Sequence, residues 1–160
     1  MTDNAFLEST IDNKNQIIRV SLIVPAPAQQ IFDLLASPAG HAVIDGSGTI
    51  NAPLADAPER LALGAKFGMD MKLGVKYNIT NEVVEFEEGS RIAWRHFGGH
   101  IWRYILEPQA DGTTKVTEEF DWKKNKSKLV LKVMGAFAKN RKSMEKTLLR
   151  LRDHFTASAN

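Results

Sequence analysis

The sequence predicts an α+β fold in which two short helices and a long C-terminal helix pack on a curved antiparallel β-sheet. A strand rich in β-branched residues leads directly into two short helical segments. Turns that contain glycine then recur at a spacing of about ten residues, which is typical of antiparallel strands joined end to end. The chain finishes with apolar residues at helical spacing, so a long amphipathic helix is expected to cover the sheet.

The first part of the chain supplies one strand and two helices. Residues 17–24 (IIRVSLIV) form the strand, and two prolines end it. Pro27 suits the first turn of a helix, and residues 28–36 (AQQIFDLLA) carry apolar side chains at helical spacing. Ser37-Pro38 then predicts a second helix, which is short because a Gly-Ser-Gly turn follows at residues 46–48.

The middle of the chain, from Lys66 onward, is expected to form an antiparallel meander. Its turns are marked by the pairs Leu73-Gly74, Glu88-Gly89, Gly98-Gly99 and Asp111-Gly112. The last segment, residues 114–122 (TKVTEEFDW), alternates most clearly. Because side chains along a strand point to opposite faces in turn, Glu118 shares one face with the apolar residues of that segment, Val116, Phe120 and Trp122.

A single long helix is expected over residues 129–155. Its apolar residues are spaced by three, four or a multiple of these: Val133, Met134, Phe137, Met144, Leu148, Leu151 and Phe155. At about 1.5 Å per residue the helix would extend ~40 Å and would need a broad surface to lie on. A strongly twisted sheet does not close completely on one straight helix, so a space between them is expected.

Composition excludes several classes of protein. With 160 residues, of which 43% are hydrophobic and 25% charged, the chain suits one globular domain, expected over residues 16–157 after a flexible tail of residues 1–15. It has no cysteine, so disulfides and cysteine-ligated metal sites are impossible. No apolar run reaches about 18 residues, and the polar start lacks the pattern of a secretory signal. A cytoplasmic protein is therefore predicted.

Positive charge is concentrated near the end of the chain, although the formal net charge is only +2. Residues 123–152 contain eleven Lys or Arg and one acid, Glu145. A solvated helix face is the ordinary interpretation. Attraction to an anionic ligand or membrane surface is the alternative, and no recognisable module supports nucleic-acid binding.

The face of the sheet that meets the long helix is predicted to line a small-molecule pocket. Aromatic walls with a few polar groups describe such sites, and methionine adapts to irregular ligands. The candidate ligand-binding residues are Met69, Met71, Tyr77, Trp94, His96, Trp102, Tyr104, Glu118, Phe120, Trp122, Met134 and Phe137. The alternative is that these side chains fill a solid core. Glu118 favours the pocket, because a carboxylate on an apolar face needs a donor or water.

Few residues are candidates for chemistry, and no nucleophile–base pair is evident. His96 and Glu118 are weak candidates for a general acid or base. Arg141 lies on the apolar stripe of the helix, where it either extends to the edge or pairs with Glu118. His41 and Asp45 share a face if their segment is helical, but two ligands without a third do not make a metal site. No metal and no cofactor are predicted.

Several segments, taken in order, resemble one superfamily over residues 16–155. They are VPAP at 24–27, IFDLL at 31–35, His41 with IDGSG at 44–48, VVEFE at 83–87, RIAWR at 91–95, WRY at 102–104, TKVTEEFDW at 114–122 and the helix end at 140–151. This order resembles the helix-grip superfamily of START lipid-transfer domains, the birch-pollen allergen and bacterial polyketide cyclases and dehydrases, the SRPBCC group. The resemblance implies a sheet of about seven strands gripping the C-terminal helix.

The resemblance also implies a function. Members hold a small hydrophobic molecule, such as a lipid, a polyketide or another aromatic or polycyclic compound, between sheet and helix. The alternatives are a polyketide cyclase or dehydratase that uses acid–base residues in the cavity, and a protein-interaction module like the chaperone activators of the same fold. The expected partner is a small hydrophobic ligand, with no nucleic acid, no integral membrane contact and at most a weak contact of the basic helix with an anionic surface.

Overall fold

The computed structural model describes residues 7–48, 50–53, 56–73 and 75–158. Within them an eight-stranded antiparallel sheet has the order β1-β2-β8-β7-β6-β5-β4-β3. Its strands are β1 (Glu8–Asp12), β2 (Ile17–Val24), β3 (Ile50–Pro53), β4 (Lys66–Leu73), β5 (Val75–Glu87), β6 (Arg91–His96), β7 (Ile101–Pro108) and β8 (Thr114–Asp121). The helices are α1 (Ala28–Leu35), α2 (Pro38–Ile44), α3 (Lys128–Val133) and α4 (Ala136–Ser158).

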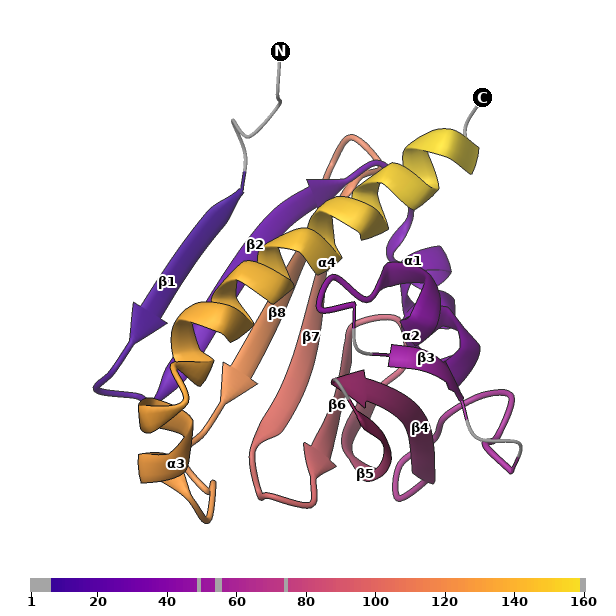
Figure 1. Ribbon diagram of the computed structural model, residues 1–160. Coiled ribbons are helices and arrows are strands. Elements are labelled where there is room, and N and C mark those ends of the chain that lie inside the picture. Colours follow the sequence, from indigo (N-terminus) through magenta and orange to yellow (C-terminus); the bar gives the residue numbers. More distant parts are fainter. Residues whose placement is uncertain (1–6, 49, 54–55, 74, 159–160) are drawn as a thin grey trace.

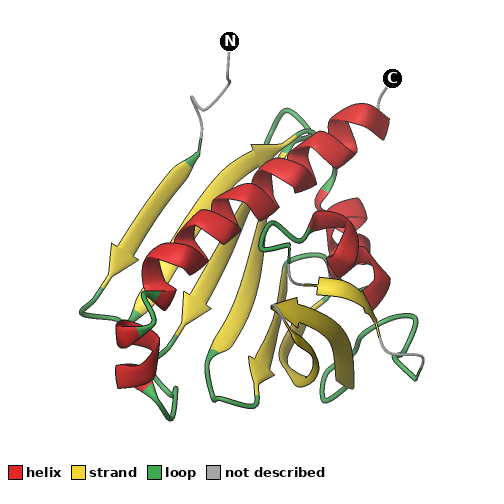
Figure 2. Ribbon diagram, in the orientation of Figure 1, coloured by secondary structure: helices red, strands yellow, loops and turns green. Residues whose placement is uncertain are grey.

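The helices α1, α2 and α4 lie on one face of the sheet, as Figures 1 and 2 show. α4 crosses the sheet diagonally over β2 and β8, α1 packs on β6 and β7, and α2 lies beside α4 and β3. The predicted α+β class is confirmed, with strand and short helices first, the meander next and a long terminal helix last. No helix of the described segments combines the length and hydropathy needed to cross a membrane.

The strand register explains why one face of the sheet is apolar. Ile18, Phe120, Trp102, Trp94 and Val83 pair in succession across β2, β8, β7, β6 and β5, so they form one continuous row. Side chains of successive residues point to opposite faces, so this row and the residues two positions along each strand from it face the helices. The core therefore lies between the sheet and α1, α2 and α4.

Charged side chains form ion pairs between strands on the outer face of the sheet. Arg19, Glu119 and Arg103 follow one another across β2, β8 and β7, and Glu85 lies two strands further on, on β5 beyond Ala93 of β6. Arg103 donates to Glu119 Oε2 at 2.8 Å and to Glu85 Oε2 at 2.7 Å, while Arg19 donates to Glu119 Oε1 at 2.8 Å. Such cross-strand pairs stabilise the sheet without requiring an apolar cover.

The expectation of a flexible tail over residues 1–15 is wrong for residues 8–12, which form the edge strand β1. β1 pairs with β2 from Glu8 opposite Ser21 to Asp12 opposite Ile17, which raises the strand number above the expected seven. Asp12 accepts hydrogen bonds from the Asn15 backbone at 2.9 Å and side chain at 2.7 Å, closing the turn. A polar strand with one core-packed residue, Ile11, gives no local signal, because its pairing partner supplies its stability.

The single helix expected over residues 129–155 is instead two helices. Gly135 has φ +64°, a left-handed conformation that favours glycine and ends α3 before α4 begins. In α4, Met144, Leu148 and Leu151 are fully buried against the sheet, as the periodicity predicts. In α3, by contrast, Val133 and Met134 are exposed, because the break turns this short helix away from the sheet.

Candidate functional site

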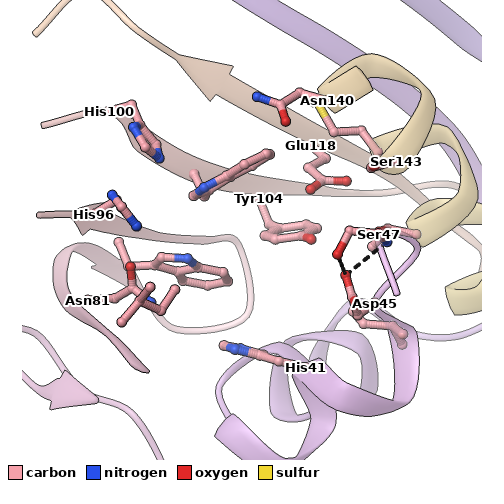
Figure 3. A pocket seen from close by; sticks show the side chains of 16 residues that line it. His41, Asp45, Ser47, Asn81, His96, His100, Tyr104, Glu118, Asn140 and Ser143 are labelled. Carbon is pink, nitrogen blue, oxygen red and sulfur yellow. Dashed lines mark hydrogen bonds between the residues drawn. The ribbon is translucent and has the colours of Figure 1, made fainter. Parts of the chain in front are cut away.

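Sheet and helices line a partly open cavity of about 270 Å³ (Figure 3). Its walls come from α2 and the loop after it, from strands β5 to β8 and from the first half of α4. Trp94 and Trp102 are cross-strand partners that both line it. Polar side chains gather at two opposite ends: His96 and His100 at one, and Asp45, Ser47 and Glu118 at the other. The cavity is therefore aromatic in the middle and polar at both ends.

The first polar end consists of two stacked histidines. The rings of His96 and His100 lie 4.4 Å apart and nearly parallel, with an interplanar angle of 15°. Their strands meet at the Gly98-Gly99 turn. Burial lowers the pKa of both rings, that of His100 to about 4 with a further contribution from His96. Both histidines are therefore neutral near pH 7.

The hydrogen bonds of this pair fix which nitrogen carries the proton. The Gly98 backbone N–H donates to His96 Nδ1 at 3.1 Å. Asn125 Oδ1 accepts from the Ser127 backbone, so its Nδ2 is the donor to His100 Nδ1 at 3.0 Å. A neutral imidazole that accepts at Nδ1 has its proton on Nε2. This end of the cavity thus holds two Nε2–H donors.

The second polar end is built around Glu118, which is 4% exposed on the inner face of β8. Its strand neighbours are Val20 on β2 and Tyr104 on β7. Burial raises the pKa of Glu118 to about 8; hydrogen bonding with Tyr104 lowers it in part, and the charge of Asp45 raises it further. The expectation that burial raises this pKa is confirmed in direction, and Glu118 is mainly protonated near pH 7.

One oxygen of Glu118 has no partner in the described part of the chain. Its Oε2 is fully buried and makes no hydrogen bond there, and the same is true of Asn81 Oδ1, also on the cavity wall. Buried polar atoms are nearly always hydrogen-bonded, because each missing bond costs about 1–3 kcal/mol. Two such atoms in one cavity leave hydrogen-bonding capacity that a ligand or water can satisfy.

His41 forms part of the wall and is not placed for acid–base chemistry. Its Nε2 bonds to the Leu35 carbonyl oxygen at 2.8 Å, and because a carbonyl only accepts, the proton is on Nε2. The ring stacks on Trp94 with centroids 4.7 Å apart. Burial lowers the pKa of His41 to about 4. A neutral ring that is hydrogen-bonded to the α1 backbone has a structural role.

A close approach of backbone to helix joins the loop after α2 to α4. The Gly46 N–H donates to Thr147 Oγ1 at 2.9 Å. A Cβ at position 46 would lie 2.4 Å from the Thr147 nitrogen and 2.5 Å from the Ser143 oxygen, so only glycine fits. The Arg150 guanidinium also donates to the Asp45 carbonyl. These contacts hold Asp45 and Ser47 at the rim of the cavity.

The structure brings together five of the predicted ligand-binding residues: Trp94, His96, Trp102, Tyr104 and Glu118 all line the cavity. Four others do not line it. Phe120 is fully buried beside Trp102, Trp122 packs on Phe137 with centroids 4.6 Å apart, and Met134 is 59% exposed on the far side of Gly135. The side chains of Met69, Met71 and Tyr77 lie outside the described residues.

Other lining residues were not predicted as ligand-binding: His41, Asp45, Asn81, His100, Asn140 and Ser143 among them. Arg141 does not pair with Glu118; it is half exposed and lies 3.8 Å from Glu145. No signal in the sequence marks Asn81, because the bulge between Val83 and Glu85 alters the alternation of β5. His100 follows the double-glycine turn, which was a usable signal. Within the described segments no group of three or more His, Asp or Glu is placed to hold a metal ion.

Comparison with known proteins gives relatives in both sequence and structure. No family model matches the chain. The chain is 37% identical over 140 residues to the uncharacterized protein Rv0088 of Mycobacterium tuberculosis H37Rv, an alignment that covers 84% of this chain. A second such protein, MT0096 of another strain of that species, is 36% identical. The chain spans 62% of the length of these relatives.

Solved structures share the fold at low sequence identity. The protein Ms6760 of Mycobacterium smegmatis superposes with a TM-score of 0.72 at 16% identity, covering 94% of this chain and 98% of that one. The Polyketide_cyc-like protein Cgl2372 of Corynebacterium glutamicum superposes with a TM-score of 0.61 at 19% identity, covering 93% and 96%. These likenesses, with the strand order and the terminal helix, confirm the helix-grip fold that the sequence resembles.

Proposed function

We propose that this helix-grip protein binds a small, flat, hydrophobic molecule that carries a polar group at each end. The observation that carries the proposal is the unpartnered Oε2 of Glu118, buried at one end of a cavity walled by Trp94 and Trp102. An apolar cavity with a few convergent polar groups and a shifted pKa is the usual form of a ligand site.

The polar groups at the two ends of the cavity determine which hydrogen-bonding groups the ligand should carry. At one end, His96 and His100 hold their protons on Nε2 and so favour a hydrogen-bond acceptor such as a carbonyl or phenolic oxygen. At the other, a protonated Glu118 donates to an acceptor and accepts from a hydroxyl. A negatively charged group is disfavoured there, because Asp45 lies on the same rim.

Cavity size selects between ligand classes. A volume of about 270 Å³ is just below that of ordinary ligand sites, which are roughly 300–1,000 Å³. It suits a compound of two or three fused or linked rings better than a long acyl chain. The aromatic side chains of Trp94, Trp102 and Tyr104 favour a ligand whose own rings stack on them.

The experiment is a titration of tryptophan fluorescence with three probes: the flavonoid naringenin, the hydroxyanthraquinone alizarin, and lauric acid as the chain-like control. Wild type should bind at least one ring compound more tightly than lauric acid. Ser143→Leu places a larger side chain on the cavity wall and should weaken binding about tenfold or more. The matched control is Lys142→Leu, whose exposed side chain neighbours the site in sequence only. Equal loss in both variants would refute the proposed site.

The same carboxyl group supports a second candidate function, acid–base catalysis of the cyclase or dehydratase kind. A carboxyl with a pKa of about 8 in a partly closed cavity can give and take a proton near neutral pH. To test this function, the protein is incubated with aromatic polyketide substrates, and product formation is followed by mass spectrometry. An enzyme would form product and lose about 10²–10⁴-fold in turnover with Glu118→Gln. A binder would form none.

A further inference from the structure

The helix α3 presents apolar side chains to the outside of the molecule. Leu129, Val130, Val133 and Met134, which together are named the α3 surface, are exposed by 73%, 52%, 78% and 59%. Positions 129 and 133, and 130 and 134, are four residues apart, so the two pairs form adjacent rows on one side of the helix. Leu131 points the opposite way and packs against the core, which fixes this orientation.

Positive charge surrounds the α3 surface. Residues 123–142 contain eight Lys or Arg and no Asp or Glu. Lys123, Lys124, Lys126 and Lys132 are exposed and form no ion pair within the described part of the chain. Lys128 differs from these four, because its ammonium group donates a hydrogen bond to the Gln16 side chain at 2.9 Å.

The α3 surface lies at the histidine end of the cavity. The Lys126 backbone donates to the Gly98 carbonyl at 2.9 Å, and Asn125 bonds to His100. The turn between β6 and β7 therefore touches the loop that leads into α3, and this turn exposes Phe97 by 70%. In Figure 1, α3 stands at the lower end of the sheet, clear of the other helices except the start of α4.

We propose that the α3 surface docks this protein on an anionic membrane surface. A short helix with exposed Leu, Val and Met, bordered by unpaired lysines, matches the pattern of helices that lie in the lipid headgroup region. The lysines favour acidic headgroups, while the four apolar side chains enter the boundary with the acyl chains. Charge of a single sign over twenty residues is what selects a lipid surface over a protein partner as the occupant.

The docked orientation would also present the cavity to the membrane. α3 is joined through Gly135 to the part of α4 that carries Asn140 and Ser143 on the cavity wall. This consequence rests on the proposed ligand binding, whereas the docking itself does not. The two are separable, because Ser143→Leu changes the cavity and leaves the α3 surface intact.

The test is cosedimentation of the full chain with vesicles of phosphatidylcholine alone or mixed with phosphatidylglycerol. Wild type should sediment with the mixed vesicles, much less with the neutral ones, and release as salt rises. Each lysine near the surface contributes about fivefold in affinity, so Lys126→Gln with Lys132→Gln should lower it about 25-fold. Leu129→Ser with Val133→Ser should lower it on the order of tenfold.

Matched controls lie elsewhere on the surface. Lys66→Gln and Leu63→Ser remove an exposed lysine and a leucine that is 66% exposed, and both should sediment as wild type does. Ser143→Leu should also sediment normally, even where it has lost ligand binding. Equal sedimentation on both vesicle types, or α3 variants that behave as wild type, overturns the proposal. Self-association without vesicles that is lost in Leu129→Ser with Val133→Ser assigns the surface to a second copy and also overturns it.

Discussion

At the scale of single residues, the cavity depends on one carboxyl group and one glycine. Glu118 is an acid on an apolar strand face, and its neighbours keep it mostly protonated by excluding water. Gly46 has the opposite role, because it contributes no side chain and so lets a loop touch α4. One residue places a carboxyl group on the cavity wall, and the other allows the loop after α2 to close against α4.

The tight contact at Gly46 predicts a large effect of a small substitution. Gly46→Ala would place a methyl group 2.4 Å from the Thr147 nitrogen, and backbone on both sides limits relaxation. We expect unfolding in urea to show a loss of about 1–3 kcal/mol, as for overpacked cores. Gly98→Ala is the control, because its Cβ would meet no atom closer than 3.4 Å. Equal stabilities of the two variants would contradict the close contact.

At the scale of elements, Gly135 divides the end of the chain into two helices with different roles. α4 carries the buried apolar stripe and one wall of the cavity. α3 carries exposed apolar residues and lysines. A continuous helix would keep both on one straight axis, so the left-handed residue is what gives α3 its separate direction.

Two leucine substitutions, one in α4 and one in α3, compare how much each helix contributes to stability. Leu148→Ala in α4 removes a fully buried side chain and leaves a cavity, so the free energy of unfolding should fall by about 2–5 kcal/mol. Leu129→Ala in α3 removes a side chain that is 73% exposed, and the change should stay within about 0.5 kcal/mol. Urea denaturation followed by circular dichroism separates the two. A large loss in Leu129→Ala would place α3 in the core.

At the scale of the whole molecule, three buried groups with large pKa shifts, His41, His100 and Glu118, dominate the expected pH dependence of stability. Burial lowers the pKa of His41 and His100 from 6.5 to about 4, so below pH 6.5 only the unfolded chain protonates them. Their contribution is complete above pH 6.5 and is lost as the pH falls. Burial raises the pKa of Glu118 from 4.5 to about 8, so its contribution is complete at low pH and is lost between pH 4.5 and 8.

These opposite signs predict a stability maximum near pH 6.5. From pH 4.5 to 6.5, His41 and His100 outweigh Glu118, and the free energy of unfolding should rise by at least about 1.4 kcal/mol per pH unit, because the lowered pKa of His96 acts in the same direction. From pH 6.5 to 8, Glu118 acts alone and the slope reverses. Glu118→Gln should abolish the fall above pH 6.5 and steepen the rise below it. Urea titrations at several pH values test both slopes, and an unchanged alkaline slope in the variant would show that Glu118 does not cause it.

The local pattern of the chain determines most of the fold. Alternation in residues 114–122 places Glu118, Phe120 and Trp122 on the inner face, and helical spacing identifies Met144, Leu148 and Leu151 as buried, both as the structure has them. These features are local because each depends on the period of one element. Five candidate cavity residues follow from the same alternation.

Tertiary structure alone decides the remaining features. β1 is a strand because the edge of β2 pairs with it, and Asn81 reaches the cavity because a bulge in β5 shifts its register. Phe120 and Trp122 share the face of Glu118 but fill the core, since Trp102 of β7 packs on Phe120 and Phe137 of α4 packs on Trp122. A period fixes the side of an element on which a residue lies. Whether that side meets a cavity, a packed core or solvent depends on elements distant in the chain, which no local pattern encodes.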